Sequence, residues 1–235
     1  MRPLLTLLLV PVLAGCARFD PADLPEEEAW LVAVKSCRLP EQLPPPVSLA
    51  HHAWFDIKQG TEGDWVRVEV MSSAAFLRRD VVRVDAIGPA SARAAERWGD
   101  RAVHLHQVVR GEEARRIGEE LVRLARGYAD AAVYNGWPGP NSNTFVERLG
   151  RQVDGLRFQL HHDAVGKDCE WLLRVGLTAS GTGVELETPL LGLQVGLEEG
   201  IELHLLQLTF GVDLWPPALE LPFLPRLGFP ATSPF

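Results

Sequence analysis

The chain has little cysteine and no cysteine motif. Its 3 cysteines form neither a Cys-x-x-Cys pair nor a Cys/His cluster with zinc-like spacing, so the sequence gives no sign of a structural zinc site. Cys16 directly follows an N-terminal apolar leader, which leaves Cys37 and Cys169 for the folded part. In an oxidising compartment these two form either a disulfide or two buried free thiols, and spacing alone does not decide between them.

Positive charge is also scarce. Lys and Arg total 23 against 31 Asp and Glu, which gives a formal net charge of −8 at pH 7. No basic patch interrupts this acidic background, so nucleic acid and anionic lipid head groups are excluded as partners that charge would attract. Beyond the leader, no apolar run reaches the length of a membrane-spanning helix.

The N-terminus holds the longest apolar run. Met1-Arg2-Pro3 precedes an apolar segment that extends to Val12, and Leu13-Ala14-Gly15-Cys16 follows. This order is typical of a secretory signal, and Leu-Ala-Gly-Cys is its bacterial lipoprotein form. We expect a signal peptide over residues 1–15 and lipidation of Cys16, with an ordinary cleaved signal as the alternative. The lipid would anchor the chain to a bilayer of the bacterial envelope, facing the periplasm; Ala17 favours the outer membrane.

Residues 16–28 are rich in proline and acidic residues, which predicts a solvated spacer. Residues 29–235 are predicted to form a single α+β domain with an antiparallel sheet and two or three helices. Hydrophobic periodicity indicates strands over 30–34, 50–58, 65–70, 81–87 and 102–109. Helices are predicted over 89–98, 111–128 and about 145–153.

The last third of the chain changes character. Glycines separate strand-sized runs from Gly176 to Gly200, which is typical of an antiparallel β-meander within residues 156–215. No self-similar unit repeats, so no solenoid is predicted. Residues 216–235 are rich in proline and are predicted to lie across the surface as an extended arm, with a partner-binding strap as the alternative.

The most distinctive stretch is a loop and helix start at residues 134–153. It begins Tyr134-Asn135-Gly136-Trp137-Pro138-Gly139-Pro140-Asn141-Ser142-Asn143-Thr144-Phe145, and the prolines predict a rigid loop. Thr144 with Glu147 fits a capping box, and a helix start one turn earlier at Ser142 fits nearly as well. Free N–H groups at such a start suit an anion or a developing oxyanion. The alternative is a loop that only caps its helix.

These residues resemble an uncharacterised bacterial family known only as a domain of unknown function. The likeness rests on Pro-Gly-Pro-Asn-Ser-Asn-Thr-Phe at 138–145, on Tyr134-Asn135 before it and on Ala164-Val165-Gly166-Lys167-Asp168 after it. It extends from about Ala50 to the C-terminus. The family supplies no function.

The chain also resembles permuted papain-like enzymes of the lecithin:retinol acyltransferase type. These enzymes place a histidine on an early strand and a cysteine in an Asn-Cys-x-x-Phe helix start, and His52-Ala53-Trp54-Phe55 and Asn141-Ser142-Asn143-Thr144-Phe145 match the two patterns in order. Serine stands where the family has its nucleophilic cysteine. The resemblance implies a hydrolase or acyltransferase acting on an envelope amide or ester, with Ser142 as nucleophile, His52 as base and Glu69 orienting the imidazole.

The favoured hypothesis is a lipid-anchored binding or structural module without catalysis. No Gly-x-Ser-x-Gly elbow supports an enzyme, and a histidine in an apolar strand is more often a packed residue. Tyr134, Trp137, Asn141 and Asn143 would then recognise an envelope ligand or protein partner through the loop.

His104 and His106 share a face of a predicted strand, a spacing that can ligate a metal. Because no third ligand lies nearby in the sequence, we expect solvent-facing strand histidines instead, and we predict no metal and no other cofactor.

Overall fold

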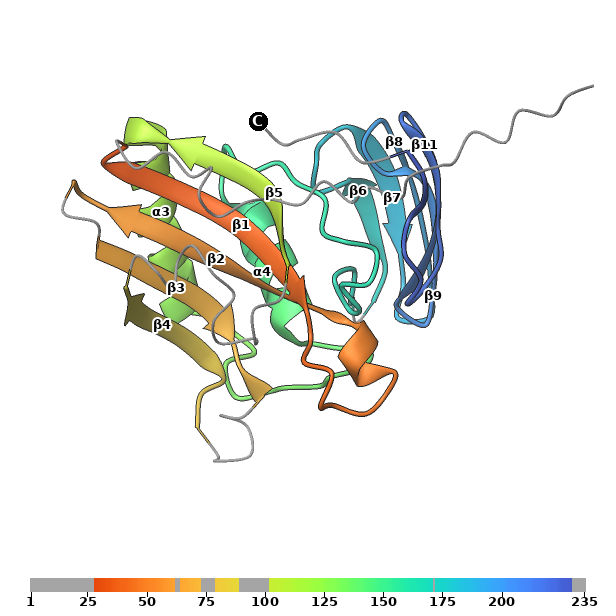
Figure 1. The fold of residues 1–235 in the computed structure, drawn as a ribbon, viewed down its shortest axis with the longest axis horizontal. Coiled ribbons are helices and arrows are strands. Elements are labelled where there is room, and N and C mark those ends of the chain that lie inside the picture. The colour runs from red at the N-terminus through yellow and green to blue at the C-terminus, as the bar shows by residue number, and fades with distance from the viewer. Residues whose placement is uncertain (1–27, 62–63, 73–78, 89–101, 171, 230–235) are drawn as a thin grey trace, which may run out of the picture.

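A computed structural model describes residues 28–61, 64–72, 79–88, 102–170 and 172–229. Within these residues the fold consists of a five-stranded and a seven-stranded antiparallel sheet with two α-helices (Figure 1). The predicted α+β class with a glycine-rich meander is confirmed. The signal peptide, nearly all of the spacer and the helix predicted over 89–98 lie outside the described residues.

The first sheet has the strand order β4-β3-β2-β1-β5. A short 3-10 helix, η2 (Val47–Leu49), precedes its second strand. The strands fall where periodicity predicted them: β1 (Trp30–Arg38), β2 (His51–Gln59), β3 (Asp64–Val70), β4 (Val82–Ile87) and β5 (Val103–Arg110). The register between β1 and β5 shifts at Val34/Lys35, which marks a bulge.

Helices α3 (Gly111–Arg126) and α4 (Ser142–Gln152) cover one face of this sheet (Figure 1). The predicted apolar stripe of α3 packs on the strands, and Ile117 and Leu121 are fully buried. Alternate strand residues face the helices, so the main core combines Phe55 and Val68 with helix residues such as Phe145. Cys37 and Cys169 are both buried free thiols, which decides against the disulfide.

The second sheet is a meander in chain order, β12-β11-β10-β9-β8-β7-β6. Its strands are β6 (Arg174–Leu177), β7 (Gly183–Glu187), β8 (Leu191–Gly196), β9 (Gly200–Leu205), β10 (Leu208–Leu214), β11 (Pro217–Glu220) and β12 (Leu227–Gly228). The predicted C-terminal arm is therefore wrong over much of its length: β11 pairs with β10 and β12 with β11. The end of the arm, residues 230–235, lies outside the described residues.

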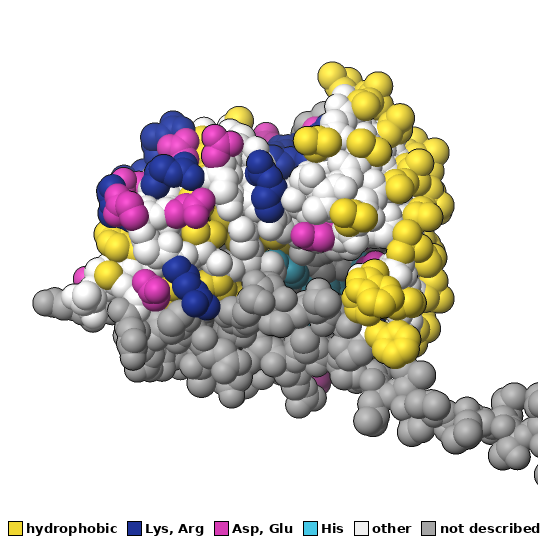
Figure 2. Space-filling view, turned by 90° about the horizontal axis from the view of Figure 1, so that it is seen from above, with side chains coloured by type: hydrophobic (Ala, Val, Ile, Leu, Met, Phe, Trp, Pro, Cys, Tyr) yellow, Lys and Arg dark blue, Asp and Glu magenta, His cyan; other side chains and the backbone are white. Residues whose placement is uncertain are grey.

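The second sheet is inverted relative to a soluble protein's sheet. Its buried face carries polar residues, with Glu185 and Glu187 on β7, Gln194 on β8, and Glu202 and His204 on β9, all at most 3% exposed. Its outer face carries aliphatic and aromatic side chains, seen as the yellow side of the molecule in Figure 2. Among the described residues, no helix is long and apolar enough to cross a membrane.

Candidate functional site

The central loop ends at Asn141, which caps α4. Asn141 Oδ1 accepts hydrogen bonds from the N–H groups of Asn143 and Thr144 at 2.9 and 3.2 Å. Thr144 Oγ1 accepts one from the Asn141 N–H at 3.2 Å, which completes a reciprocal capping box. The helix therefore starts at Ser142, and the Thr144–Glu147 capping box is wrong.

This cap uses up the donors that were expected to hold an anion. The N–H groups of Asn143 and Thr144 bond the Asn141 side chain, and the Phe145 N–H bonds the Asn141 carbonyl at 3.0 Å. Asn141, Ser142 and Asn143 are only 5, 3 and 2% exposed. The loop thus caps its helix and presents no open cluster of free donors.

The same side chains join distant parts of the chain. Asn141 Nδ2 and Asn143 Nδ2 donate to the Val165 carbonyl at 3.0 and 2.9 Å, and Thr144 Oγ1 donates to the Gly166 carbonyl at 2.6 Å. Gly166 has φ +81°, and a Cβ there would lie 2.6 Å from Asn141 Nδ2. Asn143 Nδ2 also donates to the His51 carbonyl at 2.9 Å. The two motif segments therefore form one buried joint beside the start of β2.

Two of the predicted binding residues lie further out. Trp137 is 57% exposed, and its indole N–H donates to the Leu206 carbonyl at 2.6 Å, so the loop touches the second sheet. Tyr134 is partly buried against the main core, and burial raises its phenol pKa. Tyr134, Trp137, Asn141 and Asn143 thus share no single exposed rim.

Ser142 and His52 lie on opposite sides of the first sheet. Ala53 and Phe55 point to the face that α4 covers, whereas Trp54 points to the other face, where the His52 ring stacks on it at 5.8 Å. Side chains alternate along a strand, so His52 faces away from α4. The described residues contain no hydrogen bond between Ser142 and His52. The expectation that these two side chains face each other is wrong.

The second half of the predicted triad does form. His52 Nε2 lies 2.9 Å from Glu69 Oε2, and both side chains are buried. They belong to a polar layer on the far face of the sheet, where the Asp56 carboxylate binds Lys35 and Arg67 at 3.0 and 2.8 Å. Cys37 pairs with His52 across β1 and β2 and is fully buried, so a thiol adjoins this layer of buried ion pairs.

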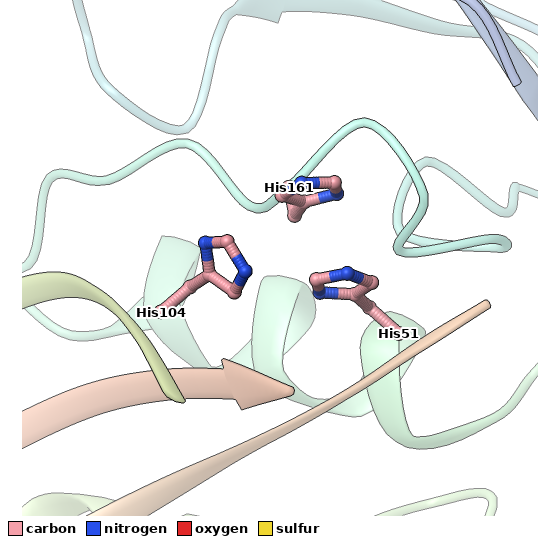
Figure 3. Close-up of side chains that lie close together, drawn as sticks. All are labelled: His51, His104 and His161. Carbon is pink, nitrogen blue, oxygen red and sulfur yellow. The ribbon is translucent and has the colours of Figure 1, made fainter. Parts of the chain in front are cut away.

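The histidine that faces α4 is His51, and it belongs to a cluster. Its ring stacks on His161 with centroids 3.8 Å apart and lies 5.0 Å from His104. One ring nitrogen from each of these three residues lies within 4.8 Å of the others. Figure 3 shows His161, on the loop after α4, above His51 and His104 at the strands. Imidazole nitrogens at such separations are potential ligands for a transition metal.

A hydrogen-bonded chain fixes part of this cluster. Ser36 Oγ lies 3.3 Å from His51 Nδ1 and 2.8 Å from His106 Nε2. The Gln159 backbone also bonds His106 and raises its pKa, so it acts as a carbonyl acceptor. Because Nε2 of His106 faces Ser36, we assign the Gln159 contact to Nδ1 of His106; Ser36 then donates to His106 Nε2 and accepts from His51 Nδ1. This arrangement leaves the lone pair of His51 on Nε2.

These imidazoles are neutral at pH 7. Burial lowers the pKa of His104 to about 4 and that of His106 to about 3. Burial, followed by the neighbouring histidines, holds the pKa values of His51 and His161 well below the usual value. His104 and His106 are half-buried and contact His51 and Ser36, so the expectation of solvent-facing strand histidines holds only in part.

A second buried cluster joins the second sheet to the loop after α4. His204 Nδ1 lies 2.8 Å from Glu187 Oε1 and its Nε2 lies 2.9 Å from Glu202 Oε2. Lys167 Nζ binds both Asp168 and Glu202 at 2.9 Å. Each of its two nitrogens faces a carboxylate, and these contacts raise the pKa of His204 to about 10, which favours the doubly protonated, positively charged ring at pH 7.

Comparison with known proteins supports the resemblance to an uncharacterised family of unknown function. The family described as "Protein of unknown function (DUF3750)" matches residues 42–169, which is more than half of the chain. The chain belongs to the DUF3750 family. The DUF3750 match includes His51, His104 and His161 and ends at Cys169, not at the C-terminus as expected. No curated protein and no solved structure matches the chain, so the papain-like resemblance stays a prediction.

Proposed function

We propose that this DUF3750 protein is a lipid-anchored envelope protein that lies against the bilayer through the outer face of its second sheet and acts there as a non-catalytic binding module. The observation that carries the proposal is the composition of that face. One row of neighbouring residues crosses all seven strands: Leu177, Val184, Val195, Ile201, Val212, Leu219 and Leu227. Every member is aliphatic and 39 to 64% exposed.

The next row repeats the pattern over five strands, with Val175, Leu186, Leu193, Leu203 and Phe210, each 39 to 69% exposed. Contiguous apolar patches larger than a few hundred Å² are rare on soluble monomers and mark membrane or protein contacts. The outward positions of these two rows carry no charge that would oppose entry into hydrocarbon. A bilayer is therefore a suitable occupant.

The N-terminal anchor favours the bilayer over other occupants. A lipid on Cys16 would hold the domain within reach of one membrane, so this surface is presented at high effective concentration. The spacer over 16–28, about 13 residues, extends to at most about 45 Å. A folded domain of about 200 residues has a diameter of roughly 40 to 45 Å. The tether therefore permits the sheet to face the membrane.

The proposed localisation is the periplasmic side of the envelope, with the outer membrane favoured by Ala17. Radiolabelled palmitate should label the wild-type protein and not Cys16→Ser. Persistent labelling of this variant would end the proposed anchoring, independently of the contact made by the sheet.

The sheet contact is tested with the unlipidated chain starting at residue 17 and neutral phosphatidylcholine vesicles. We expect it to sediment with vesicles, and raising the salt should not release it because no charge attraction is involved. Ile201→Glu should weaken partitioning about tenfold or more, since it removes half-exposed apolar surface and places a charge at the contact.

Val133→Glu is the matched control. Val133 and Ile201 are both 45% exposed, but only Ile201 lies on the outer face of the sheet. Equal partitioning of the two variants, or a wild-type chain that stays in the supernatant, would refute the membrane contact. A dimer dissociated by Ile201→Glu would assign the face to a second copy instead.

A further inference from the structure

We propose that the His51, His104 and His161 side chains form a binding site for one divalent transition-metal ion of the zinc type. The three residues come from β2, from β5 and from the loop after α4, and one nitrogen of each lies within 4.8 Å of the others (Figure 3). This site goes beyond the proposed membrane role and does not depend on it.

Binding requires the rings to close and to tilt, because the His51 and His161 planes are only 6° apart and imidazole lone pairs lie in the ring plane. Zinc bonds imidazole nitrogen at about 2.0–2.1 Å, so nitrogens of a tetrahedral site lie about 3.3 Å apart. The present separations exceed this by at most about 1.5 Å. Rotation about χ2, which is a broad torsion in histidine, moves the ring nitrogens by such amounts.

The surroundings of His51 resemble the second layer of a metal site. Metal-bound histidines commonly use their other ring nitrogen to hydrogen-bond a fixed partner, which sets the tautomer and the ring orientation. His51 Nδ1 does this through Ser36 Oγ at 3.3 Å, and Ser36 is itself held by His106 at 2.8 Å. The lone pair on His51 Nε2 is thereby available for a ligand.

His161 supplies the entry side of the site. Its side chain is 20% exposed, and histidine atoms are visible in the hollow between the two parts of the molecule in Figure 2. His161 Nδ1 accepts a hydrogen bond from the Asp163 N–H at 3.1 Å. A metal bond at this nitrogen replaces one neutral hydrogen bond, whose net contribution is only about 1 kcal/mol.

Three neutral imidazoles leave a fourth tetrahedral position for water. His162 and Asp163 directly follow His161 in the chain, and the Asp163 carboxylate already accepts the Phe223 N–H at 2.6 Å. Imidazole ligands suit zinc, copper, nickel and cobalt, whereas magnesium and calcium prefer oxygen ligands. The site should therefore select transition metals over these two ions.

The test uses the full chain without a histidine tag, treated with a chelator and titrated with Zn²⁺ by calorimetry and with Co²⁺ by visible absorption. We expect one ion per chain, the intense d–d bands of tetrahedral cobalt, and no uptake of Mg²⁺. X-ray absorption of the zinc-loaded protein should show a first shell with three imidazoles. A shell of oxygen ligands only, or no saturable uptake, overturns the proposal.

His161→Gln is the decisive variant, because this partly exposed loop side chain can be replaced without emptying the core. It should weaken Zn²⁺ binding at least tenfold, and His104→Gln should do the same. His52→Gln is the matched control: it is adjacent to His51, but its side chain lies on the opposite face of the sheet. Wild-type affinity in His161→Gln, or an equal loss in His52→Gln, would show that the metal binds elsewhere.

Discussion

The charge on His204 should make the protein less stable as the pH rises above neutrality. His204 is 1% exposed and lies between Glu187 and Glu202. Burial lowers its pKa, but the charge of Asp168 and the hydrogen bonds that His204 donates to the two glutamates outweigh burial and raise the pKa to about 10. The folded-state pKa lies above the unfolded value of about 6.5, so the folded protein binds this proton more tightly.

This difference in pKa sets the direction and the size of the change in stability with pH. The stabilisation is complete below about pH 6.5 and is lost as the pH rises through the folded pKa of about 10. Between pH 7 and pH 9 the free energy of unfolding should fall by about 2 to 3 kcal/mol from this group alone. His204→Gln should lower stability by about 3 to 5 kcal/mol at pH 7, since it leaves buried carboxylates without their cation.

Urea unfolding at pH 7, 8 and 9 measures both effects. The wild-type protein should lose stability over this interval, and His204→Gln should be nearly flat across it. Wild-type stability that is constant or rising, or an unchanged slope in the variant, would refute the charged state assigned to His204.

Two further substitutions test packing and capping. Asn141→Ala should destabilise the protein by about 3 kcal/mol, because it removes the α4 cap and leaves the buried Val165 carbonyl with one partner fewer. Thermal unfolding measures this loss. Asn135→Ala, at an exposed position of the same loop, is the control and should be near neutral. Gly150→Ala should cost about 1 to 2 kcal/mol despite the better helix propensity of alanine, because its Cβ would lie 2.5 Å from Phe158 Cζ in the core. Gly136→Ala, with no atom within 4 Å of its Cβ, is the control, and equal melting temperatures for the two glycine variants would contradict the clash.

The local hydrophobic pattern of the sequence was sufficient to predict the strands of the first sheet and helix α3. The alternation of Val66, Val68 and Val70 placed β3 correctly, and the apolar stripe from Ala114 to Tyr128 placed α3 to within two residues. The same reasoning did not identify the inner face of the second sheet. Alternation shows which residues share a face, but only the tertiary contact with Lys167 and Arg151 determines that the glutamates are buried.

The candidate site was less accessible to sequence reasoning. The neighbouring pair His104 and His106 suggested a metal but lacked a third ligand, since His51 and His161 lie far away in the chain and only the fold brings them to β5. His51 and His52 are adjacent in the strand, so their side chains point to opposite faces of the sheet, and the sequence did not show which of the two faces α4. Asn143, which holds the His51 carbonyl, shows why the loop motif matters for this strand even though the predicted serine–histidine pair is not formed.

The polar inner face and the apolar outer face of the second sheet have separate explanations. Its inner face is polar because it meets charges from the first part of the chain: Lys167 binds Glu202, and Arg151 binds Glu185 at 2.7 Å. These pairs explain buried carboxylates, but they place no demand on the alternate positions that point outward. Ordinary solvent contact would favour polar residues at those positions. The outward rows through Leu203 and Ile201 therefore call for an apolar surface of their own, and the proposed bilayer contact beside an N-terminal anchor would supply one.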